Sequence, residues 1–326
     1  MDGVVIPETD FTKVIRRDTY AAIHPTRLEL SQDGRTVVVV GSGNNIGKAI
    51  ASAFGDAHAA TVILVGRRQA VLEAAARELE DAAKSAKSPT HFHAGAVDVT
   101  DDATVDDFWA QLAADGVHVD VLVQCSGTFG QPKPLLELGL KAAHTGKGAV
   151  GVPTLDDMMA ANFRGPMNMA LHFGKQSSGG DDSKQKYFVY VSTNAVNMAD
   201  HNWLGLRPDY ILSKSTATYA FSLLADGVSP DTFQVLSFHP GMLYSDAWPP
   251  LGFTKDMLPF DEMELPAHFA VWAASQEARF LHGRYVYATW DVDELVSSAE
   301  LRARLEGDHN YLRPGIVGLT NGGHRV

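Results

Sequence analysis

The sequence reads Thr36-Val37-Val38-Val39-Val40 and then Gly41-Ser42-Gly43-Asn44-Asn45-Ile46-Gly47, a β-branched run followed by a glycine-rich turn. The run is too short and too β-branched for a helix, so it predicts a buried strand. An Ala-rich helix is expected from about 45 to 54, with Gly55 as its stop. Glycines let a backbone approach a pyrophosphate closely, and a helix N-terminus offers it free N–H groups. The turn therefore favours dinucleotide binding over an ordinary strand–helix connection.

The rest of the chain continues the alternation of strand and helix. Further strands are expected at 61–65, 92–97, 119–123, 187–191 and 233–238. Helices are expected at 69–84, 103–114, 155–173 and 209–224, and 127–153 should be an extended loop. Such alternation predicts an α/β fold with a doubly wound, Rossmann-like parallel sheet and helices on both faces.

The domain organisation follows from where this alternation begins and ends. We expect one dinucleotide-binding and catalytic domain over 35–290, an N-terminal extension over 1–34 and a C-terminal helical extension over 291–326. The segment 177–184 has the composition of a loop. A strand is expected near Tyr285. The last helix should start near Asp291 as a capped surface helix, with Glu294 three residues on completing a capping box.

Composition narrows the class of partner. The formal charge of −12 disfavours nucleic acid and anionic membranes. Cys125 is the single cysteine, so no disulfide and no cysteine-rich metal site is expected. The N-terminus lacks the apolar core of a signal peptide, and no run approaches the ~20 apolar residues of a membrane span. We therefore predict a cytoplasmic protein without a metal ion.

Two cations follow the second expected strand, in Gly66-Arg67-Arg68. An acidic residue here would bind the 2′-hydroxyl of NAD, whereas arginine favours the 2′-phosphate of NADP(H). The alternative is a solvated basic pair at the start of a helix. We predict NADP(H) as the cofactor.

A possible proton-transfer pair lies in Tyr210-Ile211-Leu212-Ser213-Lys214. Residues four apart project from one face of a helix. A nearby ammonium favours the phenolate and lowers the pKa of Tyr210, which could then exchange a proton with a substrate oxygen. The pair is informative only because it follows the fifth strand of a nucleotide-binding sheet.

Taken in order, these segments resemble the short-chain dehydrogenase/reductase family over about 36–245. A weaker similarity, in Gly283-Arg284-Tyr285-Val286 and in Trp290-Asp291-Val292-Asp293-Glu294-Leu295, is to fungal members associated with secondary metabolism. The resemblance implies that the phosphate turn, an adenine contact, the ribose contacts and the nicotinamide segment bind the cofactor. In this sequence the phosphate turn is Gly41, Asn44, Asn45, Ile46 and Gly47, and the adenine contact is Asp98 and Val99. The ribose contacts are Ser126 and Gly127, and the nicotinamide segment is Pro240, Gly241, Leu243 and Ser245.

Within the turn, Gly41 and Gly47 match the outer glycines of the family, and Asn45 stands where the middle glycine is expected. Asparagine tolerates left-handed backbone better than most residues, so the turn can form. Asp98 could instead be an ordinary carboxylate at a helix N-terminus. Cys125 is interpreted as a packed small residue rather than a nucleophile.

The resemblance also implies Tyr210, Lys214, a strand-end hydroxyl and Asn162 as catalytic residues, and it implies that Tyr210 and Lys214 contact the cofactor as well. Alignment of the fifth strand gives Thr193 as the hydroxyl, but the gap to Tyr210 is longer than in the family. Ser192, whose side chain should face the other way, stays a candidate. The family uses the residue matched by Asn162 to bind a water that connects the lysine to solvent; by itself, Asn162 would be a helix irregularity before Gly165-Pro166.

We therefore predict an NADP(H)-dependent oxidoreductase that acts on a hydrophobic carbonyl or alcohol. The expected pocket walls are 128–152, 194–208 with Trp203 and Leu204, and 242–260 with Tyr244, Trp248 and Phe253. These aromatic residues could equally pack the extensions or form a subunit interface, and a homo-oligomer, dimer or tetramer, is expected. A non-redox isomerase, dehydratase or cyclase on the same scaffold is the alternative; a nucleotide sensor would not need Tyr210 and Lys214.

Overall fold

The structure is a computed structural model. It describes residues 11–130, 132–138, 153–176, 185–197, 207–245, 248–249 and 252–315.

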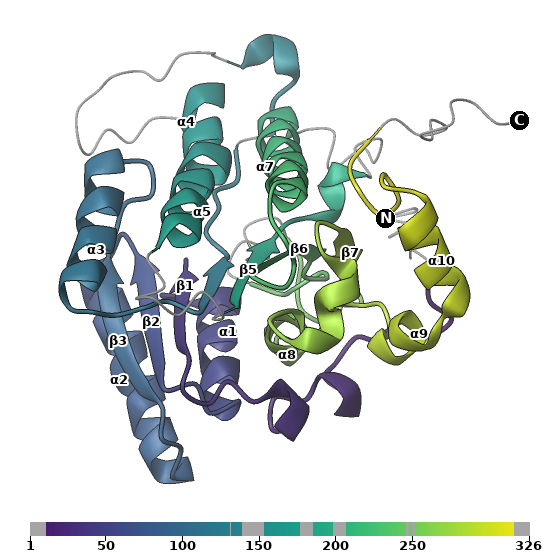
Figure 1. The fold of residues 1–326 in the computed structure, drawn as a ribbon. Helices are drawn as coiled ribbons and strands as arrows, with labels where there is room; N and C mark the ends of the chain where they lie inside the picture. The colour runs from purple at the N-terminus through teal and green to yellow at the C-terminus, as the bar shows by residue number, and fades with distance from the viewer. Residues whose placement is uncertain are drawn as a thin grey trace, which may run out of the picture.

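A seven-stranded parallel sheet forms the centre of the molecule (Figure 1). Its order is β3-β2-β1-β4-β5-β6-β7, and every neighbouring pair is parallel. The strands are β1 (Thr36–Val40), β2 (Thr61–Gly66), β3 (His91–Ala96), β4 (Val121–Gln124), β5 (Lys186–Val191), β6 (Phe233–His239) and β7 (Tyr285–Tyr287). The predicted doubly wound α/β fold is confirmed. The strand order reverses between β1 and β4, where the carboxyl ends of strands leave room for a ligand.

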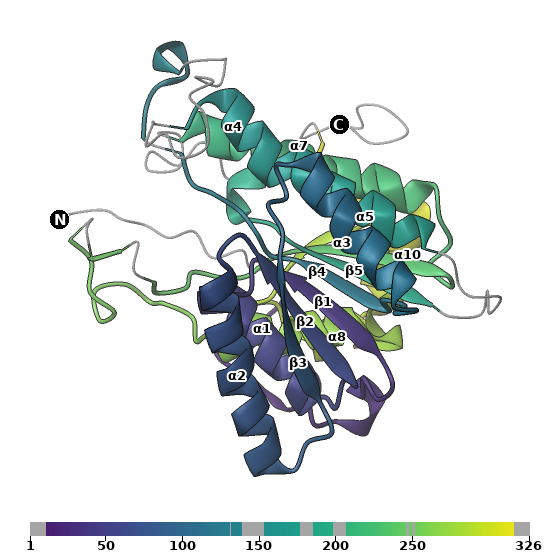
Figure 2. The ribbon, with the colours of Figure 1, turned by 90° about the vertical axis from the view of Figure 1, so that its left-hand side faces the viewer.

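Helices cover both faces of the sheet (Figures 1 and 2). One face carries α1 (Asn45–Asp56), α2 (Gln69–Ala86) and α8 (Glu264–Ala273). The other carries α3 (Asp102–Ala114), α5 (Gly165–Lys175) and α7 (Pro208–Asp226). The strands β1, β2, β4, β5 and β6 are almost entirely buried, which explains their long apolar runs, whereas the edge strand β3 is exposed at several positions. No helix in the described ranges is both long and apolar enough to cross a membrane.

Short helical turns join these elements: η1 (Ala21–Ile23), η2 (Leu28–Leu30), η3 (Leu135–Glu137), η5 (Asn194–Val196) and η7 (Gln276–Leu281). The expected loop 127–153 thus contains a turn of helix in its described part. Most of that loop, and the whole of 177–184, lie outside the described residues.

The expected end of α1 at Gly55 is wrong, because the helix continues to Asp56. Gly55 is instead needed for packing. A Cβ at this position would come within 2.6 Å of the Phe92 ring on β3. The glycine lets the end of α1 approach the sheet, and the helix ends without a left-handed glycine cap.

The helix expected over 155–173 has a break in its regular geometry. It consists of α4 (Leu155–Met159), a π-helical turn η4 (Ala160–Arg164) and then α5. The irregularity expected near Asn162 is thereby confirmed, with the asparagine inside the π turn. Such turns redirect side chains and occur often at functional sites.

Two helices, α9 (Val292–Ser297) and α10 (Ala299–Gly307), replace the single last helix that was expected. Asp291 caps α9 by accepting from the N–H of Glu294, as predicted. The capping box is wrong, because the Glu294 carboxylate accepts from the backbone N–H groups of Lys13 and Val14. The C-terminal helices therefore bind the segment 11–17, far away in the sequence.

Candidate active site

The phosphate turn has the backbone that close approach requires. Gly41 has φ +89°, and a Cβ there would lie 2.7 Å from the backbone nitrogen of Ser126. A Cβ on Gly47 would overlap the carbonyl of Gly41. Asn45 has φ +47°, so asparagine does supply the left-handed residue in place of the middle glycine.

The start of α1 leaves its N-terminal amides without a side-chain acceptor. Asn44 occupies the N-cap position in extended backbone but makes no capping hydrogen bond. Ser42 joins the turn to the two neighbouring strands: its hydroxyl donates to the Val39 carbonyl and accepts from the Val65 N–H. The turn is thus fixed to β1 and β2, and the free amides next to Ile46 can face a phosphate.

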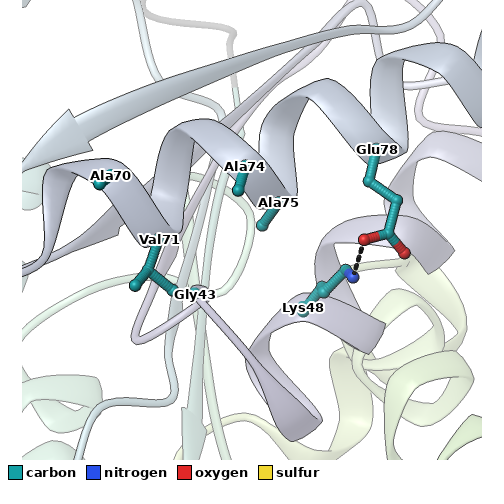
Figure 3. A pocket seen from close by; sticks show the side chains of 7 residues that line it. All are labelled: Gly43, Lys48, Ala70, Val71, Ala74, Ala75 and Glu78. Carbon is teal, nitrogen blue, oxygen red and sulfur yellow. Dashed lines mark hydrogen bonds and ion pairs between the residues drawn. The ribbon is translucent and has the colours of Figure 1, made fainter.

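The cations near this turn differ in their partners. A shallow depression between α1 and α2 begins at Gly43 and holds Lys48, whose ammonium pairs with Glu78 at 2.6 Å (Figure 3). Arg67 and Arg68 follow β2, are exposed, and form no ion pair within the described residues. Among these three cations, the two arginines are the ones available to an anionic ligand.

Asp98 lies directly after β3 and is half-buried. Its Oδ1 accepts from the N–H and the hydroxyl of Thr100. The cap of α3 is Asp101, whose carboxylate accepts from the Ala103 N–H. Asp98 is therefore not the helix-capping carboxylate that was the alternative to an adenine contact. The carbonyl of Val99, its neighbour, packs against the backbone of Gly165.

The segment after β4 comes close to the catalytic side chains. A Cβ on Gly127 would lie 3.5 Å from Oδ1 of Asn162 and 3.8 Å from Nζ of Lys214. The Ser126 hydroxyl accepts from the Gln124 side chain at 2.5 Å. Burial raises the pKa of the Cys125 thiol to about 12, which fits a packed residue rather than a nucleophile.

The two candidate hydroxyls point to opposite sides of β5. The Thr193 side chain lies close enough to the phenol of Tyr210 to lower the pKa of that phenol, and the Thr193 hydroxyl accepts from the Ala195 N–H at 3.3 Å. The Ser192 hydroxyl is instead bonded to the Thr218 hydroxyl on α7, at 2.6 Å. Strand alternation thus brings Thr193, and not Ser192, to Tyr210.

Lys214 is buried one turn after Tyr210 on α7. Its ammonium donates to the Val191 carbonyl at 2.7 Å and lies over the Tyr190 ring, 4.5 Å from the centroid. Burial lowers the pKa of Lys214 to about 8. The Val191 carbonyl therefore fixes the ammonium at the end of β5.

The expected lowering of the Tyr210 pKa is wrong for the chain by itself. Burial raises the pKa of Tyr210 to about 12, and the Thr193 hydrogen bond and the Arg207 charge offset only part of that rise. The reason is that the phenol lies in a desolvated site, where its charged form is disfavoured. Tyr210 is accordingly a protonated phenol at neutral pH.

Asn162 connects three parts of the site from within the π turn. Its amide accepts from the Thr128 N–H at 2.8 Å and donates to the Thr128 carbonyl at 3.0 Å. The same amide nitrogen donates to the Ser213 hydroxyl at 3.0 Å. The fully buried Asn162 thus fixes the loop after β4 against α7.

Sequence reasoning missed several residues around Tyr210. The Phe129 ring lies 4.6 Å from the Tyr210 ring and is 63% exposed. Arg207 donates to the carbonyl of Gly130, and the buried Asp209 carboxylate fills the space beside that glycine. Phe129 lay in an expected pocket wall, but no local pattern distinguishes it, because its contact with Tyr210 spans distant parts of the chain.

The segment after β6 turns at Gly241, which has φ +94°. Leu243 then forms an isolated parallel bridge with Asp261, and its carbonyl accepts from the Trp248 indole at 2.8 Å. Pro240 joins this turn to β6, and the Ser245 carbonyl accepts from the Trp248 N–H. The positions expected beside the nicotinamide thus form one braced turn.

The aromatic residues of the third expected wall pack against one another. Trp248 contacts Phe253 and Phe260 at ring distances of 5.7 and 5.0 Å, and Tyr244 contacts Phe260 at 5.2 Å. This arrangement favours the packing alternative for these three positions. Trp203 and Leu204, from the second wall, lie outside the described residues.

A family model described as short chain dehydrogenase matches residues 35–252. The chain belongs to the short-chain dehydrogenase family. A curated protein of Claviceps purpurea named short chain dehydrogenase/reductase is 34% identical over 309 residues, covering 94% of each chain. The predicted similarity to members from fungal secondary metabolism is confirmed by such relatives. The protein is thus an oxidoreductase of a family that binds a nicotinamide cofactor.

Solved structures of short-chain dehydrogenases share this fold. A 3-oxoacyl-[acyl-carrier protein] reductase of Brucella melitensis with bound NAD superposes with a TM-score of 0.63 at 21% identity, covering 81% of this chain and 94% of its own. A short chain dehydrogenase of Shigella flexneri 2a complexed with NADP gives a TM-score of 0.64 at 16% identity, covering 80% and 99%. At these identities the likeness concerns the fold alone.

Proposed function

We propose that the protein is an NADP(H)-dependent oxidoreductase that transfers hydride between the nicotinamide and a hydrophobic carbonyl or alcohol. The observation that carries this proposal is the buried phenol of Tyr210, which lies beside the Thr193 hydroxyl at the carboxyl end of β5. Two hydroxyls that meet in a desolvated site can hold one substrate oxygen between them.

Proton transfer then falls to the chain's own residues, while the bound nicotinamide supplies or accepts the hydride. In the reductive direction, Thr193 and Tyr210 donate hydrogen bonds to the carbonyl oxygen. Because Tyr210 is protonated at neutral pH, it can give its proton to the oxygen as negative charge develops. The Lys214 ammonium, held by Val191, stabilises the phenolate that remains.

The cofactor would lie along the carboxyl ends of β1 to β6. Gly41 and Gly47 permit close approach of the pyrophosphate, and Asp98, which follows β3, would contact the adenine. The exposed and unpaired state of Arg67 and Arg68 supports a 2′-phosphate and hence NADP(H) over NAD(H).

Assembly and location are part of the proposal. Leu212, Tyr219 and Leu223 form an exposed apolar stripe on α7 that a second copy could cover, giving the homo-oligomer. Light scattering should give a multiple of the 35.2 kDa chain mass, and Leu223→Glu should reduce it to one chain. A wild-type mass of one chain would remove this part of the proposal. The single cysteine supports a cytoplasmic location, which cell fractionation tests.

The deciding experiment follows NADPH absorbance with a panel of hydrophobic ketones and quinones. Oxidation of NADPH by at least one of them, and slower oxidation of NADH by the same compound, is the expected result. A wild-type chain that oxidises NADPH with none of them would contradict the redox assignment. Conversion of a panel compound without a change in NADPH would support the isomerase, dehydratase or cyclase alternative instead.

A further inference from the structure

A buried carboxylate braces the turn after β6. Asp261 has a side chain that is only 2% exposed, and its Oδ2 accepts from the Met242 N–H at 2.7 Å. The same carboxylate occupies the space where a Cβ on Gly241 would lie, at 2.5 Å. The Asp261 N–H in turn donates to the Met242 carbonyl at 2.8 Å. Asp261 thus determines the backbone path of the segment beside the proposed nicotinamide site.

The charge of this carboxylate is balanced by the N-terminal segment 11–17. The Arg17 guanidinium contacts Oδ1 of Asp261 at 3.2 Å and donates to the Pro259 carbonyl at 3.1 Å. The Arg17 carbonyl accepts from the Glu262 N–H at 2.8 Å. Arg17 is therefore fixed to both sides of Asp261 by side-chain and backbone contacts.

The C-terminal region holds this N-terminal segment in place. Ile15 forms an antiparallel bridge with Trp290, and the Phe11 ring stacks on the Trp290 ring at 4.3 Å. Arg16 pairs with Asp291 at 2.6 Å, and its N–H donates to the Thr289 carbonyl. None of these contacts involves Asp261 or the turn after β6, so Arg16 and Arg17 are neighbours that hold different parts of the molecule.

We propose that Asp261 and Arg17 are positioning residues that set the nicotinamide end of the cofactor site. This inference rests on the proposed NADP(H) function and adds a role for the N-terminal segment, which lies outside the residues matched by the family model. Neither side chain is placed in contact with the reacting atoms. They act through the backbone of Gly241 and Met242, which must present its groups at a fixed place.

Removal of either partner should loosen this turn. Without Arg17, the buried Asp261 carboxylate loses the guanidinium that pairs with its Oδ1, and it should respond by moving toward water or by taking up a proton. Either response weakens its hydrogen bond to Met242. Without the Asp261 carboxylate, the Met242 N–H loses its acceptor. In both cases the adenosine end of the site, built by β1, β2 and β3, is untouched.

The test compares two probes by equilibrium binding to the full chain. NADPH spans the whole site, whereas adenosine 2′,5′-bisphosphate contains only the adenosine end. Arg17→Ala and Asp261→Asn should weaken NADPH binding about tenfold and leave the bisphosphate within about twofold of wild type. Arg17→Lys, which keeps the charge, should restore most of the NADPH affinity. Arg16→Ala, the matched control, removes an ion pair from the same segment and should bind both probes like wild type.

The outcomes separate this inference from the proposed function. Equal NADPH affinity of Arg17→Ala and Arg16→Ala, or parallel weakening of both probes, would overturn the positioning role while leaving the oxidoreductase proposal intact. If Asp261→Asn fails to fold, Arg17→Ala and its lysine rescue still decide the matter. A wild-type chain that binds neither probe would overturn the proposed cofactor, and this inference with it.

Discussion

The two ends of the proposed cofactor site hold their charged groups in different ways. At the adenosine end, Arg67 and Arg68 are exposed and form no ion pair within the described residues. At the proposed catalytic end, Tyr210 and Lys214 are buried, and each has a neighbour at the carboxyl end of β5: Thr193, just after the strand, for the phenol and the Val191 carbonyl for the ammonium.

Because of this difference, we expect one end of the site to determine the affinity for the cofactor and the other to determine the rate of the reaction. Exposed guanidinium groups act on a phosphate by charge and hydrogen bonding, and their effect weakens with salt. Buried groups act through fixed geometry and shifted pKa values, and dissolved salt has little effect on either. Changes at the first end should therefore alter binding and cofactor choice, whereas changes at the second should alter turnover.

The largest effect is expected for Tyr210→Phe. The variant keeps the ring but loses the transferable proton, so turnover should fall by about 10³-fold. The NADPH dissociation constant should change by about twofold or less, because the phenol is placed at the substrate oxygen. Steady-state kinetics and a binding titration give both values. Retention of most of the turnover would remove the proton-transfer role.

Thr193→Ala and Ser192→Ala form a matched pair with the next largest difference. Thr193→Ala should reduce turnover by about 10²-fold, since one of two donors to the substrate oxygen is lost. Ser192→Ala should leave turnover nearly unchanged but lower the free energy of unfolding by about 1 kcal/mol, because the buried Thr218 hydroxyl loses one of its two hydrogen bonds and keeps only the one to the Lys214 carbonyl. The reverse pattern would make Ser192 the catalytic hydroxyl. Kinetics and urea unfolding give the two readouts.

Arg67→Ala tests the exposed end. The preference for NADPH over NADH, as a ratio of kcat/KM values, should fall about tenfold, and the wild-type preference should shrink as salt is raised. Lys48→Ala is the control: this ammonium pairs with Glu78, so the ratio should stay the same. A wild type that uses both cofactors equally well would contradict the assignment to NADP(H).

The smallest effect concerns pH. Burial lowers the pKa of Lys214 to about 8, so kcat/KM for NADPH should fall as pH rises, reaching half its plateau near that value. Lys214→Arg keeps its charge and should move the falling limb to higher pH; an unmoved limb would assign it to another group. The free energy of unfolding should change with pH in the opposite direction to kcat/KM. The unfolded chain keeps this proton to higher pH, so folding becomes more favourable above about pH 8.

The core of the fold could be predicted from the sequence because its signals are local. The run Thr36–Val40 and the turn after it identify a strand, a helix and the tight turn between them within a dozen neighbouring positions. The left-handed Asn45 could be foreseen for the same reason. The predicted end of α1 at Gly55 was wrong because, in the sequence, a glycine required for contact with Phe92 cannot be distinguished from one that ends a helix.

The catalytic end could be predicted only in part. Tyr210 and Lys214 lie on one helix, so their spacing of four residues is enough to predict that the two side chains project from the same face. The choice between Ser192 and Thr193 depended on which face of β5 meets α7. The Phe129 contact, the bonds of Asn162 to Thr128 and the raised pKa of Tyr210 all arise from burial between segments distant in sequence. No local pattern encodes them.

The contact between the two ends of the described chain has a consequence for protein synthesis. Arg16 and Asp291 are 275 positions apart, and Arg17 and Asp261 are 244 apart. On the ribosome, residues 11–17 are made before their partners, which lie at 259–262 for Arg17 and at 289–294 for residues 13–16. The sheet from β1 to β6 can form earlier. In the proposed arrangement the nicotinamide end of the site is therefore completed last, so a nascent chain acquires the proposed adenosine end before the proposed catalytic geometry.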